Sequence, residues 1–312
     1  MPSMKAVRLH AYGGADVLAY EDAPRPTAGD GEVLIRVHAA SVNPFDCAVR
    51  AGYMSAYLNY TLPVILGVDV SGIVEEVGAG VTTFKRGDSV YARGGVTRDG
   101  AYAQYAVVPA SDVATKPKSL DHIHSAAIPH ATLTAWQALF GLANLTQGQT
   151  VLIHGAAGGV GHVAVQLAKW RGAKVIGTAS RNLDFVRGLG VDEAIDYSTT
   201  PFENAVSNVD VVLDTVGGDT QQRSWQVLRP GGILVSTIQA PPEETAKAHG
   251  VRGAFVFSTP PIGEVLTEVA TLADTGKIKP EVSAVLPLQE VRKAHQMVEA
   301  GHTRGKIVLQ VA

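Results

Sequence analysis

Residues 150–161, with the sequence TVLIHGAAGGVG, constrain the fold of this chain more than any other stretch. The apolar residues 151–153 predict a short buried strand, and the apolar spacing over residues 160–168 predicts a helix. A strand, a glycine-rich turn and a helix together hold the pyrophosphate of a dinucleotide, because the turn and the helix N-terminus present backbone N–H groups. A tight turn without a ligand is the alternative interpretation. The backbone groups expected to meet the pyrophosphate are those of Gly158, Gly159 and Val160.

The residues after the next strand bear on which dinucleotide binds. A second strand is predicted at residues 174–178, at the distance expected of a βαβ unit. At its end a NAD-binding chain would carry Asp or Glu for the ribose 2′-hydroxyl. This chain has Ser180 and Arg181 instead, and a hydroxyl with a guanidinium can bind a phosphate. The sequence therefore predicts NADPH, and the alternative is that Arg181 is only a solvated surface charge.

Length and composition limit the classes of protein that this chain can belong to. The 312 residues fit two domains, and 46% hydrophobic residues allow a large core. The net charge of −3 gives no reason to expect nucleic acid or an anionic membrane as a partner. One cysteine, Cys47, excludes an internal disulfide and a multi-cysteine metal site. With no apolar run of about 18 residues, we expect a soluble cytoplasmic protein.

The pattern of predicted elements changes near residue 120. Before it, short strands separated by glycine-rich turns predict a small barrel or sandwich, at residues 5–9, 32–40, 69–77, 89–92 and 101–108. After it, helices and buried strands alternate as in a parallel sheet with helices on both faces, at residues 126–142, 150–154, 160–171, 174–178, 183–189, 209–215, 220–228, 232–238, 254–258 and 262–275. A helix at 288–300 and a strand at 306–311 are expected to return to the first domain.

Several separate motifs resemble those of one family. They are SVNPFD at 41–46, GVDVSGIVEEVGAGVTTFKRGDSVYA at 67–92, LTAWQAL at 133–139, HGAAGGVG at 154–161, DVVLDTVGG at 210–218, LRPGG at 228–232 and GKIVL at 305–309. The chain resembles the zinc-independent branch of the medium-chain dehydrogenases/reductases, the quinone oxidoreductases related to zeta-crystallin. The resemblance implies an α/β fold, with a GroES-like β-barrel catalytic domain at 1–119 and 279–312 and a Rossmann NADPH-binding domain at 120–278.

The positions that would hold a catalytic zinc in related alcohol dehydrogenases differ here. By the resemblance, Asn43 and Val68 replace a cysteine and a histidine, Asp69 replaces a glutamate, and only His130 is a metal ligand by type. We therefore expect no metal. Hydride transfer without a metal suits quinones and conjugated enones, whose acceptor carbon is already electrophilic.

The resemblance also suggests residues that act on the substrate. Asn43 is expected to face the nicotinamide ribose or the substrate, because it occupies the lost ligand position. Its alternative role is to cap a turn before Pro44. Tyr53 is expected to donate to a substrate oxygen, although Tyr57 and Tyr60 are close in sequence and ordinary packing is the alternative for all three.

Further cofactor contacts are implied by the same resemblance. Tyr197 is expected beside the 2′-phosphate or the adenosine ribose, and Thr134 near the nicotinamide unless it is only a helix-interior residue. Ser236 ends a strand of the parallel sheet, where ligands bind, and Phe257 is expected to offer its backbone to the carboxamide. The basic residues Arg304 and Lys306 are expected to reach back to the cofactor, with solvated charges as the alternative.

Together these features predict an NADPH-dependent quinone or enone oxidoreductase. The alternatives are a reductase of another activated alkene, such as an alkenal or an enoyl thioester, and a non-catalytic NADPH-binding protein. The apolar edge strand at 254–258 indicates a homodimer.

Overall fold

The computed structural model describes residues 2–257 and 261–312. Contacts divide the chain into two compact units. The first contains Met1–His130, Pro261–Gly276 and Pro280–Ala312, and the second contains Ala131–Pro260 and Lys277–Lys279. The second unit is thus inserted into the sequence of the first. No helix within the described ranges is both long and apolar enough to cross a membrane.

The first unit is built mainly of strands, which are β1 Ser3–Leu9, β2 Leu18–Pro24, β3 Glu32–Val42, β4 Val64–Ile65, β5 Asp69–Val77, β6 Ser89–Arg93, β7 Tyr105–Pro109, β8 Val113–Thr115, β15 Val282–Pro287 and β16 Lys306–Gln310. One sheet has the order β2-β1-β4. The larger sheet has the order β15-β16-β3-β5-β6-β8, and β7 also pairs with β3. The apolar faces of these strands form one buried cluster, which includes Leu9, Ile35 and Leu309.

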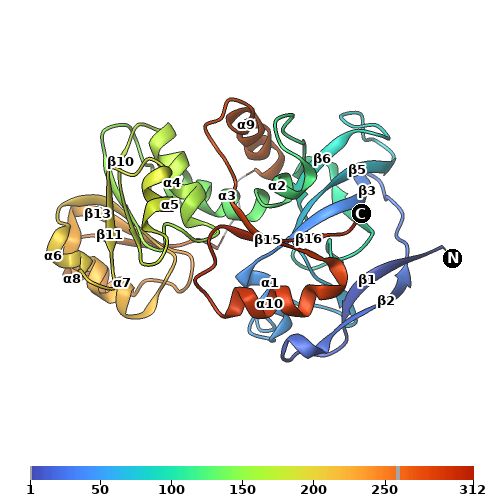
Figure 1. The fold of residues 1–312 in the computed structure, drawn as a ribbon, viewed down its shortest axis with the longest axis horizontal. Coiled ribbons are helices and arrows are strands. Elements are labelled where there is room, and N and C mark those ends of the chain that lie inside the picture. The colour runs from blue at the N-terminus through green and yellow to red at the C-terminus, as the bar shows by residue number, and fades with distance from the viewer. Residues whose placement is uncertain (1, 258–260) are drawn as a thin grey trace. The chain divides into compact units, whose positions relative to one another are not determined.

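Helices cover the ends and edges of this β-rich unit. They are α1 Pro44–Arg50, α2 His122–Ala126, α9 Ile262–Asp274 and α10 Val291–Glu299, with short 3₁₀ segments at Ala15–Val17, Ala110–Asp112 and Leu288–Glu290. Helix α1 starts with a proline at its first position, where no N–H group is needed. Helix α10 packs against α1 (Figure 1). The last strand, β16, runs antiparallel to β3 and pairs Ile307 with Val42.

The second unit has a six-stranded parallel sheet. Its strands are β9 Thr150–Ile153, β10 Lys174–Ala179, β11 Glu193–Asp196, β12 Val209–Asp214, β13 Leu228–Ser236 and β14 Arg252–Phe255, and its helices are α4 Gly161–Trp170, α5 Leu183–Gly188, α6 Phe202–Ala205, α7 Gly218–Ser224 and α8 Glu243–Ala248. The strand order β11-β10-β9-β12-β13-β14 is that of a Rossmann fold. Helices α4 and α5 lie on one face of the sheet and α7 and α8 on the other (Figure 1). The order reverses between β9 and β12, which is where such folds bind ligands.

One helix lies in a different unit from the domain in which we expected it. We expected residues 262–275 in the second domain, but α9 belongs to the first unit. It packs on β8 and β6, and the buried hydroxyl of Tyr91 donates to the carbonyl oxygen of Leu266. The boundary between the units lies after His130 rather than at residue 120.

Some element boundaries also differ from the prediction. The expected strand at 101–108 is shortened to β7, and the expected helix at 126–142 is divided among α2, α3 Pro129–Trp136 and a π-helical segment, η3 Gln137–Leu142. The expected edge strand at 254–258 is β14, which ends at Phe255. Its last expected residue, Ser258, lies outside the described residues.

Candidate functional site

The turn between β9 and α4 is tightly packed around its glycines. Gly155 has a φ of +65°, which a residue with a side chain rarely adopts. A Cβ atom on Gly161 would overlap the carbonyl oxygen of Gly155, and one on Gly158 would lie 3.2 Å from that oxygen. Ala156, at the first fingerprint position, is fully buried and its N–H group donates to the carbonyl oxygen of Thr178 in β10 at 3.0 Å. The turn therefore brings backbone N–H groups close together at the start of a helix, which suits a pyrophosphate.

The ends of β10 and β11 bring together two residues predicted from the sequence. The Ser180 hydroxyl donates to the Tyr197 hydroxyl oxygen at 3.0 Å, and both side chains are accessible. Arg181, the next residue, is exposed. The two hydroxyl groups and one guanidinium thus lie at the carboxyl edge of the parallel sheet, where they can bind a phosphate.

A buried carboxylate holds the turn that follows β12. Asp214 accepts hydrogen bonds from the N–H groups of Val216 and Gly217 at 2.9 and 2.8 Å. Its other oxygen accepts from the Ser236 hydroxyl at 3.0 Å and from the Gln221 amide at 3.1 Å. Ser236 is fully buried, and its hydroxyl orders this edge of the sheet. Its contact with a cofactor stays a prediction.

In the first unit, four residues named from the sequence, Asn43, Asp69, His130 and Lys306, meet Asp46 in a buried polar cluster. Asn43 caps α1, and its side-chain NH₂ group donates to Asp46 at 3.2 Å and to Asp69 at 2.9 Å. The Lys306 ammonium donates to the Asn43 side-chain oxygen and lies 3.6 Å from an Asp69 carboxylate oxygen. The other Asp69 oxygen accepts from the backbone N–H group of His130 at 2.7 Å.

Burial shapes the charges of this cluster. Asp46 is 1% exposed, and burial with the nearby Asp69 carboxylate raises its pKa to about 6. Burial lowers the pKa of Lys306 below its ordinary value, while Asp69 and Asp46 oppose that shift. Burial also lowers the pKa of His130 to about 3, which leaves its imidazole neutral at pH 7. The cluster thus holds one ammonium between two carboxyl groups.

This arrangement shows which contacts Asn43 and Lys306 make within the protein. Both N–H bonds of the Asn43 amide are donated to carboxylates and its oxygen accepts from Lys306, which agrees with the capping interpretation. Its role toward the nicotinamide ribose or the substrate stays a prediction. Lys306 is 4% exposed, so it is not a solvated charge, and its contact with a cofactor stays a prediction. Burial of an ammonium is expensive unless it is paired, and Asp69 supplies the pair.

The same residues do not fit a zinc ion. Val68 has no donor atom, and the Asn43 amide and Asp69 carboxylate are committed to one another and to Lys306. Within residues 2–257 and 261–312, no group of three or more His, Cys, Asp or Glu side chains is placed to hold a metal. The donor set therefore differs from a tetrahedral zinc site.

The three tyrosines near α1 have different surroundings. Tyr53 and Tyr57 are 78% and 71% exposed. Tyr60 is half-buried and lines a hollow of the first unit together with Asp46 and Phe45. Burial, helped by the Asp46 charge, raises the pKa of Tyr60 to about 12. Tyr53 stays a prediction, and the hollow beside Asp46 singles out Tyr60, which the sequence placed only among the alternatives.

The remaining predicted cofactor residues lie as follows. Thr134 is half-buried in α3, and Phe257 is 76% exposed at the end of the described range 2–257. The Arg304 guanidinium forms an ion pair with Glu281 at 2.7 Å within the first unit. Their contacts with a cofactor stay predictions.

Two buried residues that hydrogen-bond to the turns and strand ends around the proposed cofactor site were not identified from the sequence. Asp214 and His154 are buried polar residues inside motifs that the sequence had already quoted. A charged or aromatic polar residue at the end of an apolar strand is the signal that could have identified them, because a buried polar group needs partners.

Comparisons with known proteins agree with this architecture. Residues 29–118 match the family described as alcohol dehydrogenase GroES-like domain, and residues 189–309 match the family described as zinc-binding dehydrogenase. The chain is 35% identical to the mitochondrial NAD(P)H oxidoreductase RTN4IP1 of Danio rerio, over 99% of this chain and 91% of that protein. It is also 35% identical to the chloroplastic NADPH-dependent alkenal/one oxidoreductase of Arabidopsis thaliana, over 98% of this chain and 79% of that protein.

A solved structure extends the likeness to the whole fold. The quinone oxidoreductase from Coxiella burnetii superimposes with a TM-score of 0.91 at 36% identity, covering 100% of both chains. Its agreement with the GroES-like strands and the Rossmann sheet confirms the predicted fold class. The chain is an oxidoreductase that belongs to the medium-chain dehydrogenase/reductase family, in its quinone oxidoreductase branch.

Proposed function

We propose that this chain reduces quinones or α,β-unsaturated carbonyl compounds with NADPH and without a metal. The buried cluster of Asn43, Asp69 and Lys306 carries the proposal, because it replaces the donors that would hold a Lewis acid. A substrate of this enzyme must then be activated by its own structure, as quinones and enones are. Names of relatives support the substrate class, since they include an alkenal/one oxidoreductase and a quinone oxidoreductase.

NADPH is the cofactor that the second unit fits best. When bound, it supplies the hydride for the reduction. The turn at Gly155–Gly161 offers N–H groups to the pyrophosphate, and Ser180, Tyr197 and Arg181 offer donors to a 2′-phosphate. In the sequence after β10, no carboxylate occurs until Asp184, so the usual NAD-specific Asp or Glu is missing at the end of this strand.

An activity assay tests the proposed function directly. Purified protein is mixed with NADPH and with 1,2-naphthoquinone, 9,10-phenanthrenequinone or an alkenal, and absorbance at the NADPH band is followed. We expect oxidation that a strong chelator does not abolish, because the cluster contains no zinc donor set. No oxidation with any of the three acceptors would contradict an enzyme of this class, and loss of activity with chelator would contradict the metal-free mechanism.

Replacement of Arg181 tests the choice of cofactor. We expect Arg181→Ala to raise the KM for NADPH about tenfold or more, since a charge-assisted bond to a phosphate is worth roughly 1.5–3 kcal/mol. The KM for NADH should change little. Arg187→Ala is the control, because Arg187 is also exposed but pairs with Asp184 in α5. Equal effects of Arg181→Ala on both nucleotides would mean that Arg181 does not read the 2′-phosphate.

We also propose a cytoplasmic homodimer. Strand β14 is the last strand of the six-stranded sheet, and among the described residues it pairs only with β13. Its outer edge can therefore pair with the same strand of a second copy. Size-exclusion chromatography with light scattering tests the mass. Because the relatives above are mitochondrial and chloroplastic, fractionation of the source cells tests the compartment.

A further inference from the structure

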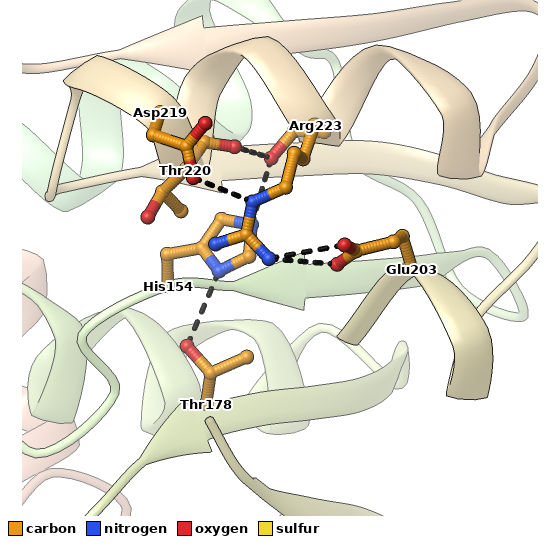
Figure 2. A network of polar contacts seen from close by, with 7 residues as sticks. His154, Thr178, Glu203, Asp219, Thr220 and Arg223 are labelled. Atoms are coloured by element: carbon orange, nitrogen blue, oxygen red, sulfur yellow. Dashed lines mark hydrogen bonds and ion pairs between the residues drawn. The ribbon is translucent and has the colours of Figure 1, made fainter. Parts of the chain in front are cut away.

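His154 is a buried polar residue directly behind the proposed cofactor turn. It follows β9 and is 1% exposed. Its Nδ1 atom lies 3.2 Å from the Thr178 hydroxyl of β10, and its Nε2 atom lies 2.9 Å from the Ser224 hydroxyl of α7. The imidazole therefore links two elements on either side of the switch point of the sheet. Figure 2 shows the ring with Thr178 on one side.

The surrounding bonds fix which ring nitrogen carries the proton. The Ser224 hydroxyl donates its single hydrogen to the carbonyl oxygen of Thr220 at 2.6 Å. It must therefore accept from His154, so Nε2 bears the hydrogen. Nδ1 is then an acceptor, and the Thr178 hydroxyl donates to it. Burial lowers the pKa of His154 to about 4, which keeps this single-proton form at pH 7.

Three charged residues beside the His154 ring, Arg223, Glu203 and Asp219, are paired with one another. Arg223 forms two hydrogen bonds with Glu203, at 2.9 and 3.1 Å, and an ion pair with Asp219 at 2.8 Å (Figure 2). The guanidinium lies over the ring of Phe202, and that ring meets His154 edge to face at 4.5 Å. His154 is thus enclosed by a fixed layer of side chains.

Thr178 connects His154 to both halves of the proposed cofactor site. Its carbonyl oxygen accepts from the N–H group of Ala156 in the glycine turn. Ser180 is the first residue after β10 and stands two residues beyond Thr178, so the path of the chain at Thr178 determines where Ser180 lies. His154 itself is fixed, because its N–H group donates to Leu213 and its carbonyl oxygen accepts from Thr215. A displacement of Thr178 would therefore move Ser180 and the following Arg181.

We propose that His154 is a positioning residue that sets the preference for NADPH over NADH. Through Thr178 it holds the end of β10 where Ser180, Tyr197 and Arg181 meet the 2′-phosphate. The bond to Ser224 only anchors α7. This role rests on the proposed use of NADPH, because only that cofactor has a phosphate at this position.

Two matched variants separate the two sides of the imidazole. Thr178→Val and Ser224→Ala each leave one nitrogen of a buried His154 without its partner. We expect similar losses in melting temperature from both. Thr178→Val should weaken NADPH binding about five- to tenfold, the worth of roughly one hydrogen bond, and NADH binding less than twofold. Ser224→Ala should leave both dissociation constants within twofold, as measured by nucleotide fluorescence titration.

Substitution of His154 itself gives a second, independent readout. The Asn side-chain oxygen stands near the place of Nδ1 and can accept from Thr178, whereas the Gln side-chain NH₂ stands near the place of Nε2 and can donate to Ser224. We expect His154→Asn to keep the wild-type ratio of NADH to NADPH dissociation constants and His154→Gln to lower it. This pair decides the question if Thr178→Val does not fold.

The outcomes separate this role from the proposed function. A wild-type chain that binds neither nucleotide, or binds both equally, refutes the proposed cofactor and the role with it. A wild-type preference for NADPH that survives both Thr178→Val and His154→Gln refutes the role of His154 alone. Equal changes of the ratio in Thr178→Val and Ser224→Ala would show that His154 only stabilises the fold.

Discussion

Replacement of Lys306 by methionine should destabilise the first unit strongly. Met has nearly the length of the Lys stem but carries no charge. The variant would leave Asp69 fully buried without its ion pair. The buried carboxyl group of Asp46 would remain in the same cluster, also without a nearby ammonium. The three remaining hydrogen bonds to Asp69, from Ser41, Asn43 and His130, do not supply a positive charge.

The magnitude follows from the burial of this pair. Removing one partner of a buried ion pair costs about 3–5 kcal/mol. With a urea m value of about 2 kcal/mol/M, the unfolding midpoint should fall by roughly 1.5–2.5 M. The loss should shrink as the pH falls from 8 to 5. The pKa of the Asp46 carboxyl group is raised to about 6 in the fold, so this group binds a proton more readily in the folded than in the unfolded chain. Its charge therefore destabilises the fold at high pH, and protonation at low pH relieves this effect.

The positions of the tryptophans allow an assay that distinguishes the units. Trp136, Trp170 and Trp225 all lie in the second unit. Tryptophan fluorescence therefore reports the second unit, whereas far-UV circular dichroism reports both. We expect urea unfolding of Lys306→Met to shift the dichroism transition more than the fluorescence transition.

The control for this prediction is Lys293→Met in α10. Lys293 forms an exposed ion pair with Glu290, worth at most about 1 kcal/mol. The reasoning is refuted if Lys306→Met is no more destabilising than Lys293→Met, or if its loss is the same at pH 5 and pH 8. Adding Asp69→Asn to Lys306→Met should recover part of the lost stability, because the uncompensated charge is then removed.

Two further predictions concern the turn and the raised carboxyl pKa. Gly161→Ala should abolish NADPH binding and cost more than about 2 kcal/mol of stability, because its Cβ would overlap the backbone of Gly155. Gly188→Ala is the control and should be neutral, because its Cβ would meet open space. Equal shifts in melting temperature for the two variants would contradict this reasoning. The pKa of Asp46, about 6 against an ordinary 3.8, should destabilise the fold as the pH rises from 4 to 6, by about 3 kcal/mol in total. Asp46→Asn should therefore gain stability relative to wild type above pH 6, and parallel pH profiles from urea titrations would count against this.

The nucleotide-binding half of the protein could be predicted from the sequence because its signals are local. The strand, turn and helix around Gly158 depend on residues within one βαβ unit, and β9 and β10 were placed within a residue of their observed bounds. The Ser180–Tyr197 contact also follows from two adjacent parallel strands. Neighbouring elements in sequence were neighbours in space, so pattern and fold agreed.

The first unit was less predictable because its key contacts join distant segments. Nothing in the residues around Asn43 indicates that Lys306, near the other end of the chain, would occupy its amide oxygen. Helix α1 did carry a local signal, an Asn followed by Pro, that is typical of a helix start. Strand β2 was missed because its acidic residues and Pro24 weaken the apolar alternation of an edge strand.

The pairing of β16 with β3 has a consequence for synthesis on the ribosome. The second unit is contiguous except for three residues and can complete its sheet while the chain is still growing. Strand β3 leaves the ribosome early and can pair with β5 and β7, but it receives β16 only when residues 306–310 emerge. The same late segment delivers Lys306 to the carboxylates of Asp69 and Asp46. A nascent chain that lacks β16 would thus carry both an unpaired sheet edge and two buried carboxyl groups without an ammonium. The first unit can therefore complete its fold only after β16 has been synthesised.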